Sequence, residues 1–138
     1  MGSAWAGLDV RPADRKGKGL FAKRRYHAGE LICTVEGTLW ESYYDPDYTD
    51  GPASYAIGHG KWIEPHADNP SRFVNHSCEP TARMGEVTKI VALRDIQPGE
   101  EITIDYATTE EDPYWFLECR CGSPRCRGKI TATLVFPK

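Results

Sequence analysis

Short runs of apolar and β-branched residues, separated by turn-forming residues, dominate this sequence. Segments 30–35, 61–64, 87–93 and 101–105 are rich in Val, Ile, Leu and Thr, and each has the length of a strand. Turns that contain Gly or Pro, such as 27–29 and 97–99, separate the segments. Only residues 110–118 suggest a helix, with Pro113 in its first turn. The pattern therefore predicts a mainly β domain.

The order of these segments narrows the fold class. Strands and helices do not alternate as they do in a nucleotide-binding βαβ fold, which disfavours that class. We expect no internal repeat and no linker within the chain. A length of 138 residues suits one domain with a single core.

Composition and charge argue against several classes of partner. The chain has 17 basic and 20 acidic residues, a net charge of −3, whereas nucleic-acid binders usually carry a basic stripe. Acidic clusters at 45–50 and 110–112 are either solvated loops or a surface that attracts a basic peptide. No apolar run approaches the ~20 residues of a membrane helix, and residues 1–8 lack the features of a signal peptide. We expect an intracellular protein with neither a direct nucleic-acid partner nor a membrane partner.

The cysteines point to a metal. Cys119, Cys121 and Cys126 form a C-x-C-x4-C motif, and Cys78 lies far upstream. Three thiols so close in sequence would strain a disulfide between them, but together with Cys78 they supply the four thiolates of a tetrahedral zinc site. Five cysteines is an odd count in a chain without a secretion signal, so a disulfide framework is not expected. The remaining Cys33, in an apolar run, is interpreted as a plain buried thiol.

Three other segments could carry chemistry, and each also has a purely structural interpretation. Gly17 and Gly19 would let the backbone approach a ligand, or they form an ordinary turn before a strand. Asn75 and His76 could read the edge of an adenine, or they fix a chain crossing. Tyr106, at the end of a strand, is either an active-site hydroxyl or part of the core.

Taken in order, segments 17–22, 72–80, 99–106 and 119–128 resemble a SET domain followed by a post-SET zinc segment. The Asn75–Cys78 motif and the C-x-C-x4-C motif are both specific, and the resemblance covers about residues 11 to 130. It divides the chain into a SET domain at 1–107 and a post-SET segment at 108–138. It implies a β-clip-like fold in which the segment around Asn75 is threaded beneath another loop as a pseudoknot.

SET domains are protein-lysine methyltransferases that use S-adenosylmethionine, so the resemblance also implies a set of roles. Tyr106 and Tyr55 would be the catalytic residues along a lysine channel. Trp115 and Phe116 would pack on adenine, line the channel or form a lid without ligand contact. The implied cofactor site comprises Lys16, Gly17, Lys18, Gly19, Arg72, Asn75, His76, Tyr106 and Phe116. The implied ligands of one structural zinc ion are Cys78, Cys119, Cys121 and Cys126.

The chain departs from the family pattern at two informative positions. Most members carry Phe or Tyr two residues before the catalytic tyrosine, where this chain has Ile104. Because Ile104 offers no hydroxyl to restrict turnover, we expect di- or trimethylation. The family's Glu-Tyr-x-Gly-Glu strand is present as residues 34–38, which keep only Gly37.

The sequence therefore predicts a lysine methyltransferase acting on a basic peptide such as a histone tail or a histone-like protein. A non-catalytic peptide-binding module with the SET fold is the main alternative, and a purely structural zinc domain is another. The location would be nuclear in a eukaryote and cytoplasmic in a bacterium. A monomer and a homodimer are both compatible with the sequence.

Overall fold

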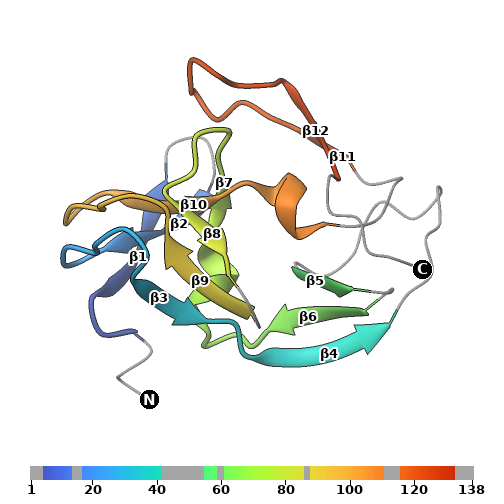
Figure 1. Ribbon diagram of the computed structural model, residues 1–138, viewed down its shortest axis with the longest axis horizontal. Coiled ribbons are helices and arrows are strands. Elements are labelled where there is room, and N and C mark those ends of the chain that lie inside the picture. Colours follow the sequence, from blue (N-terminus) through green and yellow to red (C-terminus); the bar gives the residue numbers. More distant parts are fainter. Residues whose placement is uncertain are drawn as a thin grey trace.

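The computed structural model describes residues 5–13, 17–41, 55–58, 61–85, 88–110 and 116–132. Within these ranges the chain forms three small β-sheets, a separate C-terminal hairpin and short 3₁₀ helices, as Figure 1 shows. The prediction of a mainly β domain is confirmed. None of the helices in the described part of the chain is long and apolar enough to cross a membrane.

The first sheet holds the segments that the sequence singled out for chemistry. Its strand order is β1 (Leu8–Ala13), β2 (Gly17–Ala22), β10 (Glu101–Ile104) and β7 (Asn75–His76). Strands β1, β2 and β10 pair antiparallel, whereas the two-residue β7 pairs parallel to β10. The sheet thus joins three segments that lie far apart in the sequence.

The other two sheets are antiparallel and have three strands each. One has the order β3 (Leu31–Thr34), β9 (Lys89–Ala92) and β8 (Ala82–Met84); the other has β4 (Gly37–Glu41), β6 (Lys61–Pro65) and β5 (Tyr55–Gly58). The four strands predicted from the sequence correspond to β3, β6, β9 and β10. At Gly37 a Cβ atom would lie 1.8 Å from the backbone oxygen of Glu64, so only glycine fits where β4 meets β6.

The helix predicted at 110–118 is wrong for the described part of that segment. Residues Phe116–Glu118 form strand β11, which pairs antiparallel with β12 (Lys129–Thr131). Long-range pairing outweighs local helical preference here, since Ile130 of β12 is buried among the cysteines. In Figure 1 this hairpin lies beyond the three sheets, and β12 contacts the 3₁₀ helix η4 (Tyr106–Thr109).

A structural repeat, which the sequence analysis did not expect, organises the centre of the fold. Residues 21–32 and 91–102 contain two equivalent turns that meet at Tyr26 and Ile96. These two residues exchange both backbone hydrogen bonds, at 2.9 and 2.8 Å. The same two-fold pattern continues in four more backbone bonds: Gly29 N to Ala92 O, Gly99 N to Ala22 O, Ala22 N to Glu100 O and Ala92 N to Glu30 O.

Side chains follow the same two-fold pattern. In each turn an arginine pairs with the glutamate six residues later, Arg24 with Glu30 and Arg94 with Glu100. Each glutamate also accepts from the backbone N–H three residues before it. Gly29 and Gly99 occupy equivalent positions with φ of +85° and +90°, which glycine adopts without strain. The prediction of no internal repeat was therefore wrong at the scale of a single turn and strand.

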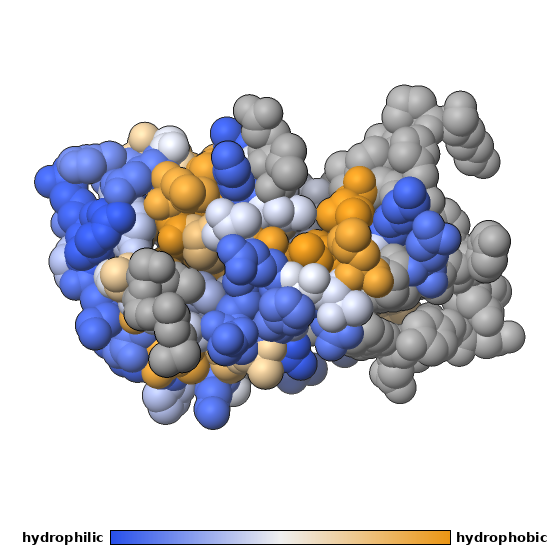
Figure 2. Space-filling model, turned by 90° about the horizontal axis from the view of Figure 1, so that it is seen from below, coloured by the Kyte–Doolittle hydropathy of each residue, from blue (hydrophilic) through white to orange (hydrophobic). Residues whose placement is uncertain are grey.

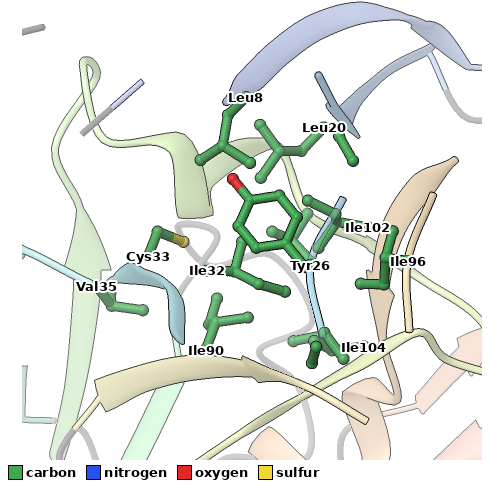
Figure 3. Packing of buried hydrophobic residues seen from close by; sticks show 14 of the residues in the cluster. Leu8, Leu20, Tyr26, Ile32, Cys33, Val35, Ile90, Ile96, Ile102 and Ile104 are labelled. Carbon is green, nitrogen blue, oxygen red and sulfur yellow. The ribbon is translucent and has the colours of Figure 1, made fainter. Parts of the chain in front are cut away.

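The hydrophobic core fills the space between the sheets. The Tyr26 ring is almost fully buried and lies among aliphatic side chains that include Leu20, Ile96 and Ile102, as Figure 3 shows. Its hydroxyl donates to the Gly7 carbonyl at 3.1 Å, which satisfies the one polar atom of the ring. Each fully buried side chain of this size contributes about 1.5–3 kcal/mol.

In the view of Figure 2 hydrophobic colour gathers in separate patches, with hydrophilic residues between them. The exposed large hydrophobic residues come from different elements of the described chain: Leu31, Leu39, Ile57, Leu93 and Phe116. Exposed apolar residues of this kind are normal on a protein surface.

Candidate active site and metal centre

Two chain segments cross where β7 meets β10, and the crossing brings His76 to Tyr106. The Ser77 N–H donates to the Ile104 carbonyl at 3.0 Å, and the Tyr106 N–H donates to Nδ1 of His76 at 3.0 Å. The two rings are tilted against each other with centroids 5.4 Å apart. Because a backbone N–H can only donate, Nδ1 of His76 is an acceptor, and the neutral imidazole carries its proton on Nε2.

A cavity of about 350 Å³ opens beside this crossing. Asn75, His76 and Tyr106 line one side, and the cysteine-containing segment 117–121 lines the other. The volume is within the range of small-molecule sites, ~300–1,000 Å³. The cavity thus lies between the crossing and the C-terminal segment, and a ligand in it would contact both.

The orientation of the Asn75 amide is fixed by its neighbours. Its Nδ2 donates to the Lys18 carbonyl at 2.8 Å and to Oε2 of Glu101 at 3.0 Å. These bonds occupy the amide donors, so Oδ1 is the atom that can accept a hydrogen bond from a ligand. A Cβ added at Gly19 would lie 2.7 Å from Oε2 of Glu101 and 3.0 Å from Nδ2 of Asn75, so it would displace the side chains that orient this amide.

Both tyrosines predicted to be catalytic donate their hydroxyls to the chain segment that precedes β7. Tyr106 donates to the Val74 carbonyl at 2.5 Å, and Tyr55 donates to the Ser71 carbonyl at 2.7 Å. Burial, together with the charge of Glu101, raises the pKa of Tyr106 to about 12, and burial raises the pKa of Tyr55 well above its usual value. Both phenols therefore stay protonated at neutral pH and act as donors, not as bases. Tyr55 is buried and lies outside the cavity lining.

The other residues predicted for the cofactor site have varied positions. Arg72 is half-exposed; its Nη1 donates to the Pro65 carbonyl at 2.6 Å and lies 3.9 Å from Glu64, so it braces the chain before the crossing. Phe116 is 50% exposed, with the Lys129 ammonium 5.0 Å above its ring. Gly17 has a φ of +75° at the start of β2. The predicted contacts Lys16 and Trp115 lie outside the described residues.

The four cysteines of the predicted metal site converge. The sulfur atoms of Cys78, Cys119, Cys121 and Cys126 all lie within 4.8 Å of one another, and those of Cys78 and Cys119 are 3.8 Å apart. A zinc ion with Zn–S bonds of ~2.3 Å in a tetrahedron would place its sulfurs ~3.8 Å apart, so the donor set fits such an ion. All five cysteines are free in this structure. Cys33 lies in the core, where burial raises the pKa of its thiol to about 12.

Two thiols of the cluster, Cys119 and Cys121, have pKa values shifted in opposite directions. Burial raises the pKa of Cys119 to about 12. At Cys121 burial is outweighed by hydrogen bonds from the backbone of Cys78 and Ser123, and the pKa is lowered to about 6. A cation that binds all four thiolates removes the competition between them for protons, which favours metal binding here.

Three residues that the sequence analysis missed connect the site. Glu101 orients Asn75, and Asp105 caps η4 by accepting from the Ala107 N–H at 3.1 Å. Arg127 donates to Asp105 at 2.7 Å and also lies 3.4 Å from the Cys78 sulfur. Asp105 and Arg127 are 22 positions apart in the sequence, so no local pattern could have revealed their contact.

The comparison with known families agrees with this architecture. A family model described as SET domain matches residues 17–107, and the chain belongs to the SET-domain family. The Homo sapiens protein named Histone-lysine N-methyltransferase 2B is 36% identical over 134 residues, covering 80% of this chain and 5% of that protein. A Cryptococcus neoformans protein named Histone-lysine N-methyltransferase, H3 lysine-4 specific, is 33% identical over 130 residues, covering 82% of this chain and 9% of that protein. The chain thus spans less than a tenth of the length of either relative.

Solved structures show the same fold. The crystal structure of KRYPTONITE in complex with mCHH DNA, H3(1-15) peptide and SAH has a TM-score of 0.69 at 24% identity, covering 89% of this chain and 29% of that chain. A second KRYPTONITE complex, with mCHG DNA and SAH, has a TM-score of 0.66 at 25% identity, covering 88% of this chain and 28% of that chain.

Proposed function

We propose that this protein is an S-adenosylmethionine-dependent protein-lysine N-methyltransferase. The observation that carries the proposal is the cavity in which Asn75, His76 and Tyr106 face the cysteine-containing segment. Membership of the SET-domain family supports it, as do relatives named histone-lysine methyltransferases and structural neighbours solved with SAH.

The methyl donor would bind in this cavity. Oδ1 of Asn75, held facing the ligand by Lys18 and Glu101, suits the ammonium group of its methionine part, and Gly19 keeps the space for that amide open. His76 would form the wall against the adenine part, and Arg72 would brace the crossing from outside. When bound, S-adenosylmethionine would supply an electrophilic methyl group, which the neutral amine of a lysine attacks while the thioether leaves.

Tyr106 would orient the lysine amine. A free lysine has a pKa of ~10.4, and both burial and the positive charge of the methyl donor would favour its neutral form. The Tyr106 phenol, whose pKa is about 12, provides a neutral hydroxyl that hydrogen-bonds without removing a proton at physiological pH. Tyr55, packed in the core with its hydroxyl on Ser71, would support the channel wall.

One zinc ion bound by Cys78, Cys119, Cys121 and Cys126 would be structural, because four thiolates leave no open coordination position. It would fasten the C-terminal segment over the cavity, with Phe116 as part of that cover. We propose that residues 108–138 are a post-SET segment on this ground.

The substrate would be a basic peptide of the histone-tail class, and the protein would be nuclear in a eukaryotic cell. Ile104 is fully buried on β10 and carries no hydroxyl, which favours addition of two or three methyl groups.

The test is transfer of labelled methyl groups to core histones by the wild type, Tyr106→Phe and the matched control Tyr26→Phe. Tyr26 also has a buried ring with its hydroxyl on a backbone carbonyl, but it lies in the core. We expect Tyr106→Phe to lower kcat by ~100-fold or more, the usual effect of removing a positioned hydrogen-bonding group, because the hydroxyl that donates to Val74 can still accept from an N–H of the lysine amine, and we expect Tyr26→Phe to retain activity. Peptide binding without methyl transfer by the wild type would indicate the non-catalytic module instead.

A further inference from the structure

The sulfur of Cys78 accepts hydrogen bonds from two different residues. The backbone N–H and the side-chain Nε of Arg127 each lie 3.4 Å from this sulfur. On another side, Nε2 of His76 lies 3.5 Å from it. Since Nδ1 of His76 accepts from the Tyr106 N–H, Nε2 carries the proton and donates to the sulfur.

Arg127 also reaches the start of the η4 helix. Its Nη2 donates to Oδ1 of Asp105 at 2.7 Å, and this oxygen is the cap that accepts from the Ala107 N–H. One guanidinium therefore joins a cysteine of the cluster to the carboxylate that begins the turn of Tyr106. A guanidinium keeps its positive charge in proteins, so this link is charge-assisted at both ends of its reach.

The two links converge on the same turn. His76 hydrogen-bonds to both Cys78 and the backbone N–H of Tyr106. Arg127 hydrogen-bonds to both Cys78 and Asp105, the residue immediately before Tyr106. Four thiolates around a divalent ion carry a net charge of −2, and the guanidinium offsets part of it. Groups that hydrogen-bond to metal ligands fix the orientation of those ligands, and their loss typically costs ~10–100-fold in metal affinity or activity.

We propose that Arg127 is a positioning residue that holds the turn beginning at Tyr106 in a fixed position relative to the metal centre. The proposal rests on the proposed function in that Tyr106 is taken as the residue that orients the lysine. A metal-bound Cys78 fixes Arg127, Arg127 fixes Asp105, and Asp105 fixes the first turn of η4. Loss of the arginine side chain frees this turn even while the four cysteines still bind the ion.

The test compares Arg127→Ala and Arg127→Lys with Arg125→Ala, which removes an exposed arginine from the same loop. A fourth variant, Asp105→Asn, keeps a good helix cap but removes the negative charge. The zinc-loaded proteins are assayed for kcat and for KM of a histone peptide. Amide hydrogen exchange at Tyr106 and Ala107 is measured by NMR on the same samples.

We expect Arg127→Ala to lower kcat by ~10–100-fold, the usual effect of losing such a group, with little change in KM. Exchange at the two amides rises at least ~10-fold, and Arg127→Lys recovers only part of the loss because an ammonium cannot bridge both partners. The double variant with Asp105→Asn is no worse than the more impaired single variant, because both act through one link.

The proposal is overturned if Arg127→Ala matches Arg125→Ala in kcat and in amide exchange, or if the effects of Arg127→Ala and Asp105→Asn multiply independently. A wild type that transfers no methyl group would contradict the proposed function alone. In that case amide exchange at Tyr106 and Ala107 still decides whether Arg127 holds the turn.

Discussion

Replacement of Tyr106 by Phe tests the protonation state of its hydroxyl through protein stability, independently of catalysis. At neutral pH the variant leaves the buried Val74 carbonyl without the hydrogen bond that it accepts at 2.5 Å. The cost of an unsatisfied buried acceptor is about 1–3 kcal/mol. We therefore expect the variant to be less stable than the wild type by this amount at pH 8.

Alkaline pH should reduce that difference. The pKa of Tyr106 is about 12 in the folded protein, against an ordinary value of 10.0. Between these values the unfolded chain loses a proton that the folded chain keeps, so the free energy of unfolding falls by ~1.4 kcal/mol per pH unit. The stabilising contribution is complete below pH ~10 and is lost as pH rises towards 12. Phe has no such proton, so the difference in stability between wild type and variant should shrink by ~1.4 kcal/mol between pH 10 and 11.

The assay is urea unfolding of both proteins between pH 8 and 11, with Tyr26→Phe as a second reference. Shared effects of pH on lysines and thiols cancel in the difference between wild type and variant. A difference that stays constant across this range would refute the inference that burial keeps the Tyr106 phenol protonated, and with it the role of that hydroxyl as a neutral donor.

Three other perturbations test separate parts of the site. Gly19→Ala should lower the free energy of unfolding by about 1–3 kcal/mol through overpacking against Asn75, and it should weaken S-adenosylmethionine binding measured by calorimetry. The control is Gly85→Ala, where the closest atom to a new Cβ is 3.4 Å away, and it should change neither quantity. Equal effects of the two variants would contradict the steric argument. Ile104→Tyr should shift the products towards monomethyl-lysine, as measured by mass spectrometry. It should also lower the free energy of unfolding by about 1–3 kcal/mol, because Ile104 is fully buried. Unchanged products would remove the basis for the proposed degree of methylation. Removal of zinc by a chelator, or Cys119→Ser, should abolish activity while the circular dichroism of the β-sheets persists, whereas complete unfolding would mean that the metal holds the whole domain.

Much of the fold follows from local sequence, because its strands carry the apolar pattern of buried β-structure. Segments 61–64 and 101–105 are examples, and both are strands. Elements that depend on distant partners escaped prediction. β11 forms only because β12 lies beside it. The repeat does leave a sequence signal, since Arg24, Gly29 and Glu30 recur 70 residues later as Arg94, Gly99 and Glu100, but its meaning depends on the backbone bonds between the two turns.

In the candidate site, too, some residues could be predicted from local sequence, and others depend on contacts between distant parts of the chain. The cysteine spacing predicts a cluster, and the structure brings the four sulfurs together. Asn75, His76 and Tyr106 are also brought to one cavity. By contrast, Glu101 and Arg127 are ordinary charged residues in the sequence. Their importance comes from Asn75 and Asp105, which only the folded chain places beside them.

The paired turns at Tyr26 and Ile96 also bear on how the chain acquires its structure during synthesis. Each turn uses the other to satisfy its backbone groups, and β2, which pairs with β1 along one edge, finds the neighbour for its other edge in β10. A growing chain that ends before Ile96 therefore holds β2 with one hydrogen-bonding edge open, because β10 has not yet been made. Domains with such distant pairings fold slowly, in milliseconds to seconds. The nascent chain would consequently depend on chaperones until the segment around Ile96 leaves the exit tunnel, and aggregation during expression should be worst for fragments that end before it.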